Sequence, residues 1–162
     1  MANVSAQEIV QRAYDLMGAP YRPWQSGNSI PMWQDDGFPR NGAGQLDFHL
    51  SQVGVMGADL INWALVSNGL DSNGGTGTFR NNLTNIFDFD PDTPAERGAI
   101  ALRPYQGPQD DVSISLYVGP HQVIQSIPGE GVTDRYTDQQ MYSRPEPRYH
   151  FTIYGRLRNV RY

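Results

Sequence analysis

The sequence predicts one α+β domain in which helices pack against an antiparallel β-sheet. Apolar residues recur at helical spacing in the first part of the chain, whereas strand-like alternation dominates the second half. No linker, internal repeat or low-complexity tract divides the 162 residues, a length that suffices for one hydrophobic core. We therefore expect a single domain over residues 1–162.

Two segments have the pattern of helices. Ser5 and Glu8 form a capping-box pattern at the start of a helix that we expect over residues 5–17. A second, more apolar helix is expected over residues 58–68. Between them, at about residues 25–52, lies a long polar and glycine-rich loop. Loops of this length either serve a function, pack on another surface or form a mobile excursion.

The second half contains four strand patterns, at residues 98–105, 111–119, 121–127 and 148–160. In residues 111–119 apolar residues occupy every second position, which predicts that they share one face of a strand. Ser113 and Ser115 would then lie on the other face and be exposed to solvent or lightly buried. The Gly119-Pro120 dipeptide predicts a hairpin turn. The C-terminal segment is expected to close the sheet, either as an edge strand or as a strand that pairs with a partner.

Composition and charge exclude several function classes. The chain has no cysteine, which excludes disulfides, thiolate catalysis and cysteine-based metal sites. A net charge of -5 and a pI near 5.0 argue against nucleic acid as the main partner. The sequence has neither a signal-peptide pattern nor an apolar run that could span a membrane, so no membrane insertion is expected.

Neither a metal nor a cofactor is predicted. The three histidines lie in separate segments and lack the spacing of metal ligands: His49, His121 and His150. Three alternating aspartates lack the glycine and glutamate of a calcium loop, so we expect them in a solvated turn: Asp88, Asp90 and Asp92. Six aromatic residues are either core or, if exposed, contacts for sugar or protein: Tyr21, Trp24, Trp33, Trp63, Tyr105 and Tyr117.

Four segments together resemble the NlpC-type cell-wall endopeptidases, a branch of the papain-like cysteine peptidases. "AYDLMGAPYRPW" resembles the opening helix of that family, and "GVMGADLINWALVSNGL" resembles its nucleophile helix. "ERGAIALRPY" resembles the first core strand, and "SISLYVGPHQVIQS" resembles the histidine-bearing strand with its turn and the next strand. The match is closest to peptidase domains of lysins from phages of mycobacteria and related actinobacteria. It implies a papain-like α+β core.

The resemblance also implies where a catalytic triad would lie. In that family a thiol at a helix N-terminus attacks, a histidine serves as its base, and a third polar residue orients the imidazole. The nucleophile position falls on Gly57, or on Ala58 after a slip of one residue. The base position falls on Ser113, or on Asp111 after a slip of two, and the orienting position falls on Gln125. Only Gln125 retains a compatible side chain.

These losses imply a pseudoenzyme that does not hydrolyse peptides. Because nucleophile and base are both missing, natural decay explains the pattern better than an engineered knock-out. The phage resemblance implies a virion component, such as a minor tail or tail-tip protein, that contacts other virion proteins through the loop at about residues 25–52. The alternatives are a non-hydrolytic domain that binds peptidoglycan stem peptides and an active endopeptidase with displaced catalytic residues. A cleft plugged by Met56 or by this loop would favour the virion role.

Overall fold

The computed structural model describes residues 3–21, 57–70, 87–89, 96–102, 114–146, 149–151 and 153–162. In chain order the elements are β1 (Val4–Ser5), α1 (Ala6–Asp15), α2 (Gly57–Val66), β2 (Phe87–Phe89), β3 (Ile100–Leu102), β4 (Ile114–Tyr117), β5 (Val123–Ile127), β6 (Gly131–Thr133), α5 (Asp138–Tyr142), β7 (Ile153–Leu157) and β8 (Val160–Arg161). The predicted loop at about residues 25–52 lies outside the described residues. Among those described, no helix combines the length and apolar character needed to cross a bilayer.

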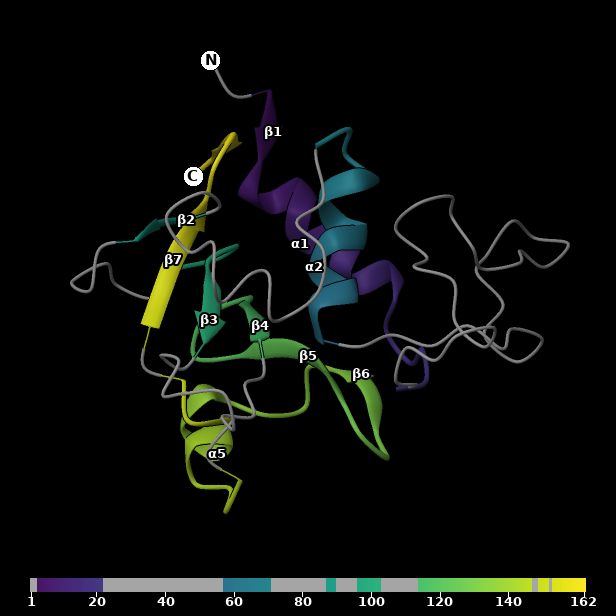
Figure 1. Ribbon diagram of the computed structural model, residues 1–162, viewed down its shortest axis with the longest axis vertical. Coiled ribbons are helices and arrows are strands. Elements are labelled where there is room, and N and C mark those ends of the chain that lie inside the picture. Colours follow the sequence, from purple (N-terminus) through teal and green to yellow (C-terminus); the bar gives the residue numbers. More distant parts are fainter. Residues whose placement is uncertain are drawn as a thin grey trace, which may run out of the picture.

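Six strands form one antiparallel sheet in the order β2-β7-β3-β4-β5-β6. Helices α1 and α2 pack together on one side of this sheet, and α5 lies on the other side (Figure 1). β1 and β8 form a separate parallel pair, with Val4 opposite Val160. The arrangement confirms the α+β class that the sequence predicts.

The first helix begins where the capping-box pattern predicts. Ser5 Oγ accepts a hydrogen bond from the Glu8 backbone N–H at 3.2 Å, and Glu8 Oε2 accepts one from the Ser5 N–H at 2.7 Å. These bonds, mainly the one from the Ser5 backbone, lower the pKa of the Glu8 carboxyl below its ordinary value. The face of α1 that points into the protein carries Ile9, Val10 and Ala13, which are buried in the core that α1 shares with α2.

The second helix is buried on several sides, as its apolar sequence predicts. Six consecutive residues are buried: Leu60, Ile61, Asn62, Trp63, Ala64 and Leu65. The turn that follows α2 contains Gly69, which has a positive φ of +80°. The next N–H, of Leu70, donates to the carbonyl of Leu65 at 3.0 Å. Contacts of α2 with β4 and β5 fix this helix over the middle of the sheet.

Both faces of the sheet are covered, and this corrects one prediction. Ile114 and Leu116 of β4 belong to the core under α1 and α2, which we call the helix-side core. Tyr117 belongs to a second cluster with Met141 of α5, which we call the α5-side core. Ser115 is 0% exposed, so the prediction of a solvent-facing or lightly buried serine is wrong at this position. Alternation in the sequence predicts which residues share a face of a strand, but it does not predict whether another segment of the chain covers the second face.

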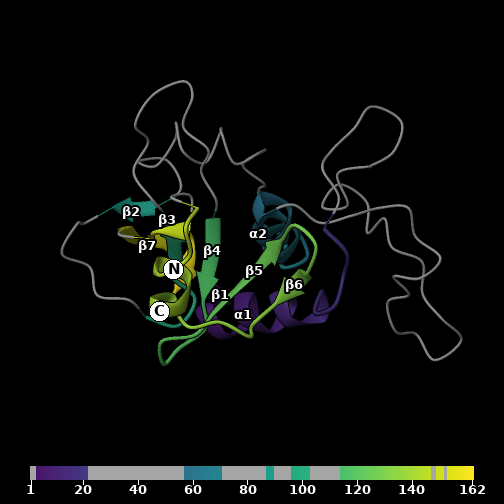
Figure 2. The same cartoon turned by 90° about the horizontal axis from the view of Figure 1, so that it is seen from below.

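The predicted hairpin is present between β4 and β5. Leu116 lies opposite Ile124 and Tyr117 opposite Val123. The turn between the strands contains a cis Gly119-Pro120 peptide bond. Figure 2 shows that β4 and β5 diverge as they run away from this turn.

The structure corrects the edge position expected for the C-terminal segment and the turn expected at Asp88. The C-terminal segment supplies β7, which lies between β2 and β3 rather than at an edge, and then β8, which pairs with β1. The edge strand on this side of the sheet is β2, and its register places Asp88 opposite Arg156. Asp88 is therefore in a strand and not in the predicted turn, whereas Asp90 and Asp92 lie outside the described residues. The sequence pattern of each segment is local, but its place in the sheet depends on distant partners.

Candidate functional site

The N-terminal end of α2 is the position where the family resemblance places a nucleophile. The helix begins at Gly57, and this end lies toward β5 (Figure 1). The partial positive charge of a helix N-terminus stabilises an anion such as a thiolate. Gly57 has no side chain to attack a carbonyl, Ala58 follows it, and the whole sequence contains no cysteine. The helix end is therefore suitable for a nucleophile that the chain does not have.

Gln125, the expected orienting residue, is buried in β5 on the α5 side of the sheet. Its side chain is 1% exposed. Its Nε2 donates to the Met141 thioether sulfur at 3.2 Å, and its Oε1 has no partner among the described residues. Val123 and Ile127, which flank it on the same face, both belong to the α5-side core. The carboxamide thus contacts α5 and points away from the core that α2 shares with the sheet.

The two positions expected for the base, Ser113 and Asp111, lie outside the described residues. Convergence of Gly57, Ser113 and Gln125 at one helix–strand junction therefore stays a prediction. The nearby Ser115 is described, and its Oγ has no hydrogen-bond partner in the described part of the chain.

The two described histidines are not arranged as a base for these positions. His121 lies in the β4–β5 turn, where its side chain is 73% exposed and its Nδ1 is 3.8 Å from Asp138 Oδ1. His150 Nε2 is 2.6 Å from the Arg144 carbonyl oxygen, and its ring lies 4.8 Å from that of Tyr142. His49 lies outside the described residues, within which no group of three or more His, Asp or Glu side chains is suited to a metal ion.

Of the six aromatic residues singled out in the sequence, two are core. Trp63 and Tyr117 are 4% and 6% exposed, and the Tyr117 ring meets that of Tyr154 edge to face at 6.0 Å. Tyr21 is partly buried, and the remaining three lie outside the described residues: Trp24, Trp33 and Tyr105. The exposed aromatic in the described chain is instead Tyr142 of α5, which the sequence analysis did not single out.

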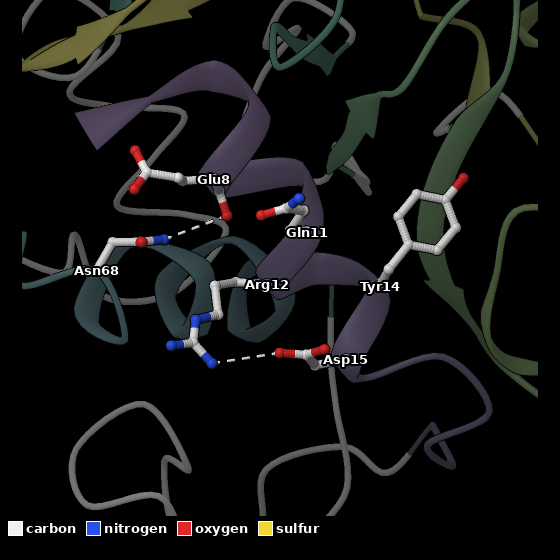
Figure 3. A pocket seen from close by; sticks show the side chains of 6 residues that line it. All are labelled: Glu8, Gln11, Arg12, Tyr14, Asp15 and Asn68. Carbon is white, nitrogen blue, oxygen red and sulfur yellow. Dashed lines mark hydrogen bonds and ion pairs between the residues drawn. The ribbon is translucent and has the colours of Figure 1, made fainter.

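A surface hollow of about 570 Å³ lies over the outer face of α1 and beside Asn68, in the turn that follows α2 (Figure 3). It is lined by six residues: Glu8, Gln11, Arg12, Tyr14, Asp15 and Asn68. Arg12 pairs with Asp15 at 3.3 Å, and Asn68 donates to the Ala64 carbonyl at 2.8 Å. Most of its polar groups are thus engaged within the protein, and the hollow carries no catalytic arrangement.

The segment that covers Gln125 is held to the sheet by an arginine that the sequence analysis missed. The Arg144 guanidinium lies 5.3 Å from the centre of the Tyr136 ring and 5.0 Å from that of Tyr149. It also lies 3.6 Å from a carboxylate oxygen of Glu130 and 3.6 Å from one of Glu146. Its position therefore connects the β5–β6 turn to the segment that follows α5.

We expect Arg144→Ala to lower the free energy of unfolding by about 1–2 kcal/mol, because the side chain is only 26% exposed and loses two ring contacts and two ion pairs. Arg135→Ala is the matched control. Arg135 also contacts Glu130 and Tyr136, but it is 71% exposed, so its removal should cost no more than about 0.5 kcal/mol. Urea denaturation measures both values, and equal effects would contradict a special role for Arg144.

No protein-family model and no curated protein matches this sequence. Solved structures match it in fold. RipA substituted at a histidine has 18% identity and a TM-score of 0.54 over 97% of this chain and 62% of that chain. The peptidoglycan hydrolase RipB of Mycobacterium tuberculosis has 20% identity and a TM-score of 0.56 over 93% and 63%. RipD of M. tuberculosis, a non-catalytic NlpC/p60 domain protein adapted to peptidoglycan binding, has 18% identity and a TM-score of 0.54 over 93% and 94%.

The fold is therefore that of NlpC/p60 domains, with the papain-like core that the resemblance implies. This chain spans about 62% of the RipA chain and about 63% of the RipB chain. Identities of 20% or less establish the fold alone, and the neighbours with this fold include a hydrolase and a non-catalytic protein.

Proposed function

We propose that this chain is a non-hydrolysing protein of the NlpC/p60 type. The observation that carries the proposal is Gly57 at the start of α2, in a sequence without any cysteine. A papain-like peptidase requires a thiolate at that end of the helix, because the thiolate forms the covalent intermediate. The Ser113 hydroxyl cannot replace it without a base in reach, and the carboxamide of Gln125 is not a nucleophile.

The spacing of substituted residues in RipA supports part of this assignment of positions. Structures of RipA carry single substitutions at a cysteine, a histidine or a glutamate. The histidine and the glutamate are twelve residues apart in that chain, which is also the separation of Ser113 and Gln125. The interval from the cysteine to the histidine is seven residues shorter there than the interval from Gly57 to Ser113, so the spacing supports the assignment of Ser113 and Gln125 and not that of Gly57.

The function that we place first is binding of peptidoglycan, through its stem peptides, without cleavage. RipD supports it, because that protein combines the same fold with a peptidoglycan-binding function and no catalysis. Loss of a nucleophile removes the chemical step and leaves the remainder of a substrate cleft available for binding.

A second candidate is a structural role in a phage virion, as a minor tail or tail-tip protein that contacts other virion proteins. Its support is the resemblance of the sequence to the peptidase domains of phage lysins, which implies a virion component. Burial of Gln125 is compatible with this role, but the orienting residue of an active triad is buried as well.

Co-sedimentation with purified mycobacterial peptidoglycan separates the two candidates. We expect saturable binding of the folded protein and none above background for the same protein after denaturation. Binding that rises linearly without saturation, or that the denatured control matches, would contradict the binding function. The virion role would then be tested by identifying proteins in purified phage particles.

A further inference from the structure

Two buried side-chain oxygens on the neighbouring strands β4 and β5 lack a hydrogen-bond partner among the described residues. They are Ser115 Oγ and Gln125 Oε1, and their residues are 0% and 1% exposed. A polar atom that loses water on folding and gains no partner destabilises the folded state. Native structures therefore satisfy nearly all such atoms, either with protein groups or with ordered water.

The two residues lie across from each other at the place where β4 and β5 begin to separate. The last paired residues at this end are Leu116 and Ile124, so Ser115 and Gln125 are the next residue on each strand. Figure 2 shows the two strands diverging in this direction. Because side chains alternate along a strand, both side chains point into the α5-side core. The divergence explains why the two oxygens do not bond each other directly.

The residues paired with Ser115 and Gln125 across the sheet, and the one that contacts Gln125 from α5, are uncharged. Ala101 lies opposite Ser115 on β3, and Thr133 lies opposite Gln125 on β6. Met141 covers the row from α5, and its sulfur accepts the hydrogen bond from Gln125 Nε2 at 3.2 Å. The amide nitrogen is thereby engaged, which fixes the carboxamide orientation. Oε1 can only accept, and it has no donor among the described residues.

We propose that Ser115 and Gln125 form a buried binding site for one water molecule between β4, β5 and α5. Water is the smallest molecule with two donors, so one molecule satisfies both oxygens at once. The residues named here carry no charge that an ion would balance. The site gives Gln125 a structural role, in place of the orienting role that the family resemblance assigns to its position.

The sign of the stability change tests the proposal. With the water in place, Ser115→Ala and Gln125→Met each remove one of its partners, and we expect each to lower Tm by about 2–6 °C. The double variant should lose less than the sum, because both substitutions disrupt the same water. Gln125→Met also removes the hydrogen bond to Met141, so the sign is decided by Ser115→Ala. Without the water, Ser115 Oγ is an unsatisfied buried atom, and removing it would raise Tm, which would overturn the proposal.

Met141→Leu is the matched control, since it removes the sulfur acceptor of Gln125 and leaves both oxygens in place. Its effect on Tm should add to that of Ser115→Ala, because the two residues share no partner in the proposed site. A crystal structure of the unaltered chain gives a direct second measurement. We expect ordered water within hydrogen-bond distance of both oxygens, and a direct Ser115–Gln125 bond or a dry contact would overturn the site.

Discussion

Purified protein incubated with peptidoglycan is expected to release no peptide fragments above background. Loss of one member of a catalytic triad lowers the rate by about 10⁴-fold or more, and here the expected nucleophile and base positions both lack a competent side chain. Mass spectrometry of the soluble products measures the release, with a peptidoglycan hydrolase as the positive control. Stem-peptide cleavage by the unaltered chain would revive the alternative of displaced catalytic residues.

Gly57→Cys alone is also expected to leave the rate at background, because a thiol without a positioned base gains little nucleophilic assistance. The double variant Gly57→Cys/Ser113→His tests whether these are the family positions. We expect measurable cleavage from the double variant and none from either single variant. A folded double variant without any activity would contradict the assignment of Gly57 and Ser113 to the nucleophile and base positions. It would leave the assignment of the fold unchanged.

Gly131→Ala is expected to lower the free energy of unfolding by about 3 kcal/mol or more. Gly131 has a φ of +78°, and a Cβ at this position would lie 2.3 Å from the Ala19 carbonyl oxygen. That carbonyl accepts the Val132 N–H at 2.8 Å, and the Val132 carbonyl accepts the Gly18 N–H at 3.0 Å. The backbone beside β6 therefore cannot move away without losing its hydrogen bonds.

Gly129→Ala separates the cost of the clash from the cost of the backbone conformation. Gly129 has a similar φ of +82°, but a Cβ there would meet nothing within 4 Å. Its substitution should cost about 1–2 kcal/mol, the penalty of a left-handed conformation alone. Urea midpoints at matched slopes measure the difference between the two variants. Equal midpoints would show that the backbone at β6 and Ala19 shifts to accommodate the Cβ without loss of stability.

Local sequence signals predicted the elements whose partners are close in the chain. The capping box of Ser5 and Glu8 set the start of α1, and the Gly119-Pro120 turn set the hairpin of β4 and β5. A similar local signal was overlooked in α5. Thr137 and Gln140 have capping-box spacing, and the structure contains both of their hydrogen bonds. The helix that covers Gln125 was therefore within reach of sequence reasoning.

The remaining errors concern contacts between distant parts of the chain. The position of β7 inside the sheet depends on β2 and β3, and neither partner is encoded in the pattern of residues 148–160. Burial of Ser115 depends on α5, which follows it by more than twenty residues. For the candidate site, the sequence indicated the helix end at Gly57 and the strand position of Gln125. It did not indicate that Met141 contacts the carboxamide.

The parallel pairing of β1 with β8 has a consequence for synthesis and for engineering. Val4 is synthesised long before its partner Val160, so this pair forms only after most of the contacts between them in the sequence are available. The Tyr162 hydroxyl then donates to the Gly98 carbonyl at 2.7 Å and fixes the last residue against the body of the protein. Both chain ends consequently emerge together, far from α5 (Figure 1). An affinity tag or a tether to a surface at either end leaves the α5 side facing the solution.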